Sequence, residues 1–329
     1  MSDLIHAMNG KLEEFIHIAY ENLKEGDEEA ALGFLKEALK IDYEHQEVLY
    51  ALKCLNWWLE KIQHLVDFYD PYEQGIYILS QWDSYYCFLG RIEESCLPVK
   101  EVCDSCQYAI KRFVFCRALY FFLILLKDSN NQQDPVLLLQ TGRCCKGAGD
   151  WEDAQWYLEQ ACRLKRDDGA VLSELADVNA LLGEIRAAKV LFREAFYLDP
   201  QSVDLNGLES EMIKNLRDKV RDKGHEGSEL AEWIPVWGNI WGVFSVKREL
   251  KPVELGRLKQ AILSLENEYR SQSAGLKGEP NPLTKPKLLN RYFWLIDHCE
   301  YNRDTSGLLD ETMLKIKFID PAIFDCYRI

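Results

Sequence analysis

The sequence predicts an all-α protein: a solenoid of antiparallel helix pairs that continues into a helical C-terminal extension. Three observations support this prediction. A segment of about 34 residues recurs in the middle of the chain. Small and large apolar residues recur within it at helical spacing, and glycines and prolines stand where helices would end. With 329 residues, of which 47% are hydrophobic, the chain can bury the core that such an array needs.

The clearest repeat aligns residues 138–168 with residues 172–202. The small residues would let the helices of a pair approach closely, the larger ones would fill the space between them, and the glycines would supply the turn. The matching positions are Leu138/Leu172, Gly142/Ala176, Gly149/Gly183, Ala154/Ala188, Leu158/Phe192, Ala161/Ala195 and Leu164/Leu198. A third copy has the same spacing in Phe15, Ala19, Gly26, Ala31, Leu35, Ala38 and Ile41.

These recurring positions resemble the tetratricopeptide-repeat (TPR) family, and the close match covers about a third of the chain. The resemblance implies a right-handed TPR-type α-solenoid, in which the first helix of each pair lines a concave groove. It also implies a non-enzymatic scaffold or adaptor that binds a protein or peptide segment in that groove. Self-association of the array stays open.

The repeats divide the chain into five parts. Residues 1–45 are predicted to form an N-terminal TPR unit, 46–134 irregular helical pairs that continue the solenoid, and 135–202 two well-formed TPR units. Residues 203–223 are highly charged, which suits the capping helix at the end of an array. Residues 224–329 would form a Trp-containing junction and a C-terminal helical region with a degenerate repeat-like pair.

Further helices are expected where apolar residues recur and prolines or glycines interrupt them. We expect them over 46–68, 71–90, 97–127 (one bent helix or a pair), 252–272 and 287–327 (a helix pair), with a loop over 273–286. The longest apolar run, 118–126, is far shorter than the ~20 residues that span a bilayer, so it predicts a buried helix.

The candidate groove residues are the side chains of the first helices that packing does not use. They are Glu13, His17, Tyr20, Lys24, Gln140, Arg143, Lys146, Ser173, Glu174 and Asp177. Some TPR proteins clamp a C-terminal carboxylate with Lys, Asn and Arg side chains, but Tyr20, Arg143 and Asp177 stand where the Asn is needed. The acidic and basic residues together favour a ligand of mixed charge. The alternative is that these residues are merely exposed polar side chains.

The segment 233-WIPVWGNIWGVF-244 places Trp233, Trp237 and Trp241 four residues apart, on one side of a helix. We expect these tryptophans to be core residues that fasten the C-terminal helices to the array. An exposed partner site and a peripheral membrane-docking segment are the alternatives. Gly238 and Gly242 form a second stripe, where another helix could come close.

The chain has 11 cysteines without the regular spacing of a disulfide framework. Cys103 and Cys106 form a CxxC motif with Cys96 and Cys116 nearby, which raises a metal- or redox-sensing module as an alternative function. A zinc site needs a second matching pair, which is absent, so structural thiols are favoured and no metal site is assigned.

No catalytic arrangement emerges from the sequence. The six histidines have no ligand spacing, and the chain has neither a phosphate-binding loop nor a nucleophile elbow. We therefore expect no enzyme and no cofactor. The net charge of -15 opposes binding to nucleic acid and to anionic membranes. The opening residues lack a secretory signal, which indicates a reducing, cytoplasmic compartment.

Overall fold

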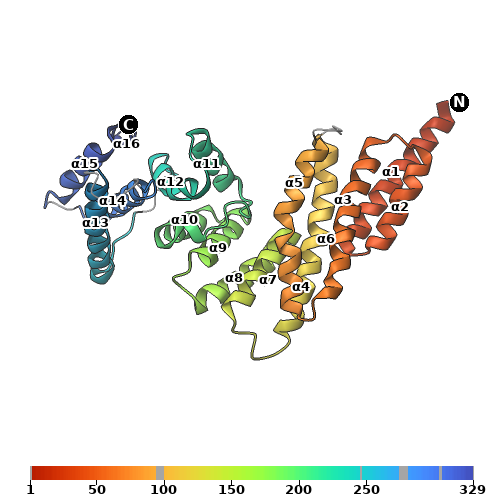
Figure 1. The fold of residues 1–329 in the computed structure, drawn as a ribbon, viewed down its shortest axis with the longest axis horizontal. Coiled ribbons are helices and arrows are strands. Elements are labelled where there is room, and N and C mark those ends of the chain that lie inside the picture. Colours follow the sequence, from red (N-terminus) through yellow and green to blue (C-terminus); the bar gives the residue numbers. More distant parts are fainter. Residues whose placement is uncertain (1, 94–99, 245–246, 274–280, 304–305, 329) are drawn as a thin grey trace. The chain divides into compact units, whose positions relative to one another are not determined.

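The structure is a computed structural model that describes residues 2–93, 100–244, 247–273, 281–303 and 306–328 (Figure 1). Within these residues every regular element is a helix and none is a strand, which confirms the all-α prediction. The chain divides into two compact units, Met1–Ala161 and Cys162–Ile329. Each unit has a large cluster of buried hydrophobic side chains.

Unit 1 is a series of helices joined by short connections (Figure 1). They are α1 (Ser2–Glu25), α2 (Glu28–Ile41), α3 (Gln46–Gln63) with the 3-10 turn η1 (His64–Asp67), α4 (Pro71–Ser80), α5 (Trp82–Glu93), α6 (Lys100–Leu126), α7 (Pro135–Ala148) and α8 (Trp151–Leu164). Pro71 and Pro135 occupy the first turns of α4 and α7, where the missing N–H costs no helical hydrogen bond.

Helix α6 is the central helix of unit 1, because it contacts α1, α3, α4 and α7. Two of its rings lie directly on glycines. A Cβ at Gly75 of α4 would stand 2.6 Å from the Phe122 ring, and one at Gly147 of α7 would stand 2.4 Å from the Phe115 ring. Both distances are shorter than any real carbon contact. The absence of a side chain at these two glycines is therefore what lets α4 and α7 approach α6.

The repeat positions of unit 1 pack as the sequence predicts. Helix α1 packs on α2, and Ala31, Leu35 and Ala38 of α2 are fully buried. In the α7–α8 hairpin a Cβ at Gly142 would stand 2.6 Å from Leu158, so this glycine does allow the close approach. The turns at Gly26 and Gly149 have φ values of 86° and 88°, which glycine adopts without strain.

Unit 2 contains α9 (Gly169–Leu181), α10 (Ile185–Leu198), η2 (Pro200–Ser202), α11 (Glu211–Asp222), α12 (Gly227–Ile240), α13 (Pro252–Ser273), α14 (Thr284–Tyr301), α15 (Leu308–Ile319) and α16 (Pro321–Arg328). Helices α9 and α10 form a hairpin whose turn, Gly183, has φ 85°. The predicted packing residues Ala188, Phe192 and Ala195 of α10 are fully buried.

The later helices complete the core of unit 2 around α14, which contacts α12, α13 and α15. Helix α12 also packs on α10 and α11, and α15 packs on α16. Polar contacts tie α14 to the end of α10, because Asn290 and Arg291 donate hydrogen bonds to the carbonyls of Phe196 (3.1 Å) and Tyr197 (2.6 Å).

Several predicted helices differ from the observed ones. The helix expected over 71–90 is interrupted at Gln81, and the two pieces are α4 and α5. No proline or glycine marks this break. The residue after it, Trp82, packs its ring near Trp58 (5.7 Å between centroids) and Phe115 (5.0 Å), so the start of α5 is held by aromatic contacts.

The capping helix expected over 203–223 begins only at Glu211. The side chains of Val203 and Leu208 are buried, so this irregular segment contributes to the core of unit 2 although it is not helical.

The run 118–126 was predicted to be a buried helix, and it is only partly buried. Phe122 is fully buried, whereas Tyr120 is 60% exposed, so this part of α6 buries one face and leaves another in contact with solvent. Residues 274–280 of the loop expected over 273–286 lie outside the described ranges, and α14 already begins at Thr284. The helix pair expected over 287–327 is instead three helices, α14, α15 and α16, with residues 304–305 outside the described ranges.

Candidate functional site

The candidate groove residues fall into two groups by exposure. Glu13 and His17 of α1 are exposed, and Lys24, Gln140 and Arg143 are partly exposed. The remaining five, Tyr20, Lys146, Ser173, Glu174 and Asp177, are buried. Those on α1 and α7 belong to unit 1, and those on α9 belong to unit 2. Of the ten predicted residues, two are therefore exposed, three are partly exposed and five are buried.

Two of these residues make well-defined contacts inside unit 1. Tyr20 donates a hydrogen bond to Glu47 of α3 (3.0 Å), and burial raises the pKa of the Tyr20 hydroxyl, which keeps its proton for this bond. Lys24 pairs with Glu21 (2.7 Å) and lies over the ring of Tyr108 on α6, 5.5 Å from its centroid. Both contacts help to fix α1 against its neighbours.

Asp177 has a role that the sequence did not indicate. Its carboxylate is fully buried and accepts hydrogen bonds from the backbone N–H groups of Glu209 (2.7 Å) and Ser210 (2.8 Å). Those two residues directly precede α11, where N–H groups have no helical partner. Asp177 therefore anchors the start of α11 to α9.

The tryptophan segment forms most of α12 and lies mainly in the core. Trp233 and Trp237 are 7% and 8% exposed, whereas Trp241 is 37% exposed and stacks on Trp237 at 4.9 Å. A Cβ at Gly238 would meet the Phe244 ring at 2.4 Å and Leu216 of α11 at 3.2 Å, so this glycine does permit a close approach. Gly242 instead adopts φ 69° in the turn that follows the helix.

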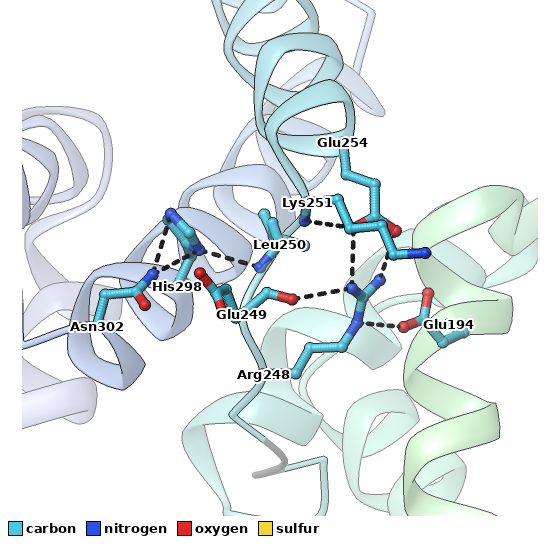
Figure 2. A network of polar contacts seen from close by, with 8 residues as sticks. All are labelled: Glu194, Arg248, Glu249, Leu250, Lys251, Glu254, His298 and Asn302. Atoms are coloured by element: carbon cyan, nitrogen blue, oxygen red, sulfur yellow. Dashed lines mark hydrogen bonds and ion pairs between the residues drawn. The ribbon is translucent and has the colours of Figure 1, made fainter.

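A polar network holds the segment before α13 in place, and Figure 2 shows its residues. Arg248 is its centre. It donates to Glu194 of α10 (2.8 Å) and to both carboxylate oxygens of Glu254 at the start of α13 (3.2 and 3.3 Å). Glu254 also accepts from the backbone N–H of Lys251 at 2.7 Å. The carboxylates of Glu194 and Glu254 compensate the positive charge of Arg248, so the network links α10 to the start of α13.

Helix α14 holds the other side of the same segment. The backbone N–H of Leu250 donates to Nδ1 of His298 at 3.1 Å (Figure 2). This bond requires an unprotonated Nδ1, because an N–H donor needs a lone pair to bond to. Lys247 also pairs with Glu300 at 2.6 Å. Residues 247–251 are thus fastened to α14 as well as to α10.

A buried ion pair lies beside this network. Arg193 of α10 pairs with Asp297 of α14, and both side chains are almost wholly buried. The guanidinium groups of Arg193 and Arg248 lie over the Trp294 ring, 4.5 and 5.4 Å from its centroid. Burial lowers the pKa of Arg193 to about 10, so the side chain remains charged at neutral pH. The cluster therefore binds α10 to α14 through compensated charge and ring contacts.

The exposed face of α13 was not identified from the sequence. Val253 and Leu263 are 67% and 58% exposed, and Gly256, Gln260 and Asn267 lie between and beyond them on the same face. Their spacing alternates three and four residues, which is the spacing of helix residues that contact a second helix. This spacing is visible in the sequence. Only the structure, however, shows that these side chains are exposed and do not belong to the core of the protein.

Basic side chains flank this face. Arg257 and Lys259 are exposed, and no acidic side chain among the described residues pairs with either. Arg270 follows at the next position of the pattern, is 73% exposed and pairs with Glu266 at 3.8 Å. The edges of the face therefore carry two basic side chains, Arg257 and Lys259, that have no acidic partner among the described residues, although the whole chain has a net charge of -15.

Of the four cysteines of the alternative hypothesis, the three that the structure describes do not gather as a metal site. Cys96 lies outside the described residues, Cys103 and Cys116 are partly buried, and Cys106 is fully buried. Cys106 instead contacts Cys54 of α3, which the sequence gave no reason to choose. Among the residues that the structure describes, no three histidine, cysteine or acidic side chains gather as a metal site.

Comparison with protein-family models finds no family that matches this chain, and comparison with curated proteins finds no matching relative. Among the described residues, no helix combines the length and the apolar character needed to cross a membrane.

Proposed function

We propose that the protein is a non-enzymatic scaffold that binds a protein or peptide partner, with the exposed face of α13 as a binding surface. The observation that carries this proposal is Gly256. A glycine in the middle of a helix costs about 1 kcal/mol relative to alanine. No atom of the described residues stands within 4 Å of a Cβ at this position, so no contact among them explains the glycine. A partner helix packed closely against Gly256 would explain why this position has no side chain.

The residues around Gly256 fit such a partner. Val253 and Leu263 are about 15 Å apart along the helix axis and would supply the apolar contacts at either end. Gln260 and Asn267 stand in the same row, where polar residues select one register of a helix pair. Arg257 and Lys259 lie at its edges, so acidic residues on the partner would complement them. We therefore propose a partner helix with an apolar stripe edged by Glu or Asp.

The TPR resemblance supports the same class of function. Helix hairpins with Gly142, Ala154, Ala188 and Ala195 at their contacts are what a TPR-type solenoid requires, and we propose that fold for the repeats. Under this proposal the exposed side chains of α1, Glu13 and His17, form a second candidate contact surface. A cytoplasmic location belongs to the same proposal.

Peptide binding tests the α13 surface. A three-heptad helical peptide with Leu in its apolar row and Glu beside it is titrated into the full chain by calorimetry, with a Lys-for-Glu peptide as the matched control. We expect only the Glu peptide to bind, and the double variant Arg257→Glu/Lys259→Glu to prefer the Lys peptide. Leu263→Ala should weaken binding roughly tenfold, and Leu314→Ala, on an exposed position of α15, should not.

Affinity capture then identifies the natural partner. The wild-type chain and the Arg257→Glu/Lys259→Glu variant are used side by side as bait. A partner recovered with the first and lost with the second supports the proposal. If neither peptide binds, or if every captured protein is retained by the variant, α13 is not the binding surface.

A further inference from the structure

A cluster of thiols and hydroxyls lies between α1, α3, α5 and α6 in unit 1. Cys54 of α3 and Cys106 of α6 are fully buried and in side-chain contact. Tyr50 of α3 is also buried, and Gln107 of α6 donates both to the Tyr50 hydroxyl (2.9 Å) and to the Cys54 sulfur (3.5 Å). Polar groups of this kind are unusual in an otherwise apolar core.

The contacts distinguish the two cysteines. The Cys54 sulfur accepts a hydrogen bond from Gln107 at 3.5 Å, and it also contacts the Cys106 thiol. The hydrogen bond from Cys106 is the main cause that lowers the pKa of Cys54, and the same bond, together with burial, raises the pKa of Cys106. The N–H of Gln107 stabilises negative charge on the Cys54 sulfur, which favours Cys54 as the nucleophile of the pair and leaves Cys106 as the thiol that retains its proton.

The cluster lies close to the surface. Gln107 and Glu47 are each only partly buried, and they contact Cys54 and Tyr20 respectively. A small oxidant needs only a brief displacement of these side chains to reach the sulfur atoms. A bulky disulfide reagent such as oxidised glutathione would need helices to separate.

We propose that Cys54 and Cys106 are a modification site that forms a disulfide with hydrogen peroxide and so links α3 to α6. The Cys54 thiolate attacks one peroxide oxygen, an S–O bond forms, the O–O bond breaks and hydroxide leaves. Cys54 becomes a sulfenic acid, and the peroxide is reduced. The Cys106 sulfur then attacks the Cys54 sulfur, the S–S bond forms, the S–O bond breaks, and the hydroxyl leaves with the Cys106 proton as water.

Disulfide mapping tests this site. The reduced full chain is treated with hydrogen peroxide under native conditions, unreacted thiols are alkylated in denaturant, and the unreduced digest is examined by mass spectrometry. We expect a peptide pair joined through Cys54 and Cys106 that dithiothreitol separates. Cys54→Ser should abolish it, and Cys299→Ser, at a buried cysteine of unit 2, should leave it unchanged.

A second variant tests the site without changing either cysteine, in case the cysteine variants do not fold. Gln107→Met keeps the size of a partly exposed side chain but removes the N–H that bonds to Cys54. It should slow formation of the cross-link roughly two- to tenfold, with an unchanged circular dichroism spectrum. The proposal is overturned if Cys106 pairs with Cys103 instead, or if the exposed Cys87 and Cys326 are oxidised while Cys54 stays reduced. An unchanged rate in Gln107→Met would overturn the role of Cys54 as the nucleophile.

Discussion

Asp177 and Ser210 are 33 positions apart in the chain, yet the buried carboxylate of the first accepts the backbone N–H of the second at 2.8 Å. The same carboxylate accepts the N–H of Glu209 at 2.7 Å. One side chain of α9 thereby holds the non-helical segment that leads into α11, and the position of α11 in unit 2 depends on it.

Replacing this carboxylate should destabilise the protein. Asp177→Ala leaves two N–H groups in the interior without acceptors, so we expect the free energy of unfolding to fall by about 2–4 kcal/mol. Asp177→Asn, which keeps one acceptor oxygen, should cost less. Urea unfolding followed by circular dichroism measures both. The exposed Asp167→Ala is the control, and a loss of equal size in that variant would contradict the anchoring role.

The tryptophans of α12 should differ sharply in their contribution to stability. Trp233→Ala and Trp237→Ala remove buried rings and should each cost about 3–5 kcal/mol of unfolding free energy. Trp241→Ala removes an exposed ring and one stacking contact, so about 0.5–1.5 kcal/mol is expected. Thermal and urea unfolding give the comparison. Three equal losses would show that Trp241 is as deeply packed as the other two.

Two glycine-to-alanine substitutions should have opposite effects. In Gly238→Ala the new methyl group would meet the Phe244 ring at 2.4 Å, which should cost about 1–3 kcal/mol. In Gly256→Ala the methyl group enters open space and the helix gains about 0.5–1 kcal/mol. The midpoint of thermal unfolding should therefore fall in the first variant and rise in the second. If both fall, the exposed face of α13 is not open.

Gly256→Ala should also weaken partner binding although it stabilises the free protein. A bulkier variant, Gly256→Leu, should weaken binding further, because the partner helix could no longer come close. The peptide titration described above measures this effect. Unchanged affinity in both variants would show that α13 binds without close approach at Gly256.

Acid should weaken the network around Arg248. The hydrogen bond from Arg248 is the main cause that lowers the pKa of Glu254 below its ordinary value of 4.5. The stabilisation is therefore complete above that value and is lost as the pH falls through the lower pKa of the folded state. Because the pair is partly exposed, we expect at most about 1 kcal/mol. Urea unfolding at about pH 6 and about pH 3.5 should show a smaller acid loss in Glu254→Gln than in the wild type.

The parts of the fold that the sequence predicted are those with a local pattern. The hairpins at residues 138–202 and the helix over 252–272 follow from spacings that lie within one or two turns, and both are confirmed as helices. The packing roles of Gly142 and Gly238 also follow from such spacing, because a glycine inside a helix costs stability unless a neighbour needs the room.

The missed features depend on partners far apart in the chain. Contacts of this kind produce no spacing pattern that could be recognised in the sequence. Examples are the contacts of Asp177 with Ser210, Arg248 with Glu194 and Cys54 with Cys106. The break between α4 and α5 has no proline or glycine to mark it, and Trp82 directly after it packs on Trp58, a residue far away in the sequence. The α13 face was visible as spacing, but the sequence does not show which faces of a helix the rest of the chain leaves uncovered.

The two rings of α6 that lie on glycines also set a limit on how this gene can change in length. Phe115 and Phe122 are seven positions apart, close to two helical turns, and each must face its own glycine. One codon inserted or deleted between them would turn one ring by about 100° relative to the other. Either Gly75 of α4 or Gly147 of α7 would then no longer face its ring, and that helix would lose its close contact with α6. The connection between Leu126 and Pro135 could vary in length at a far lower cost in stability.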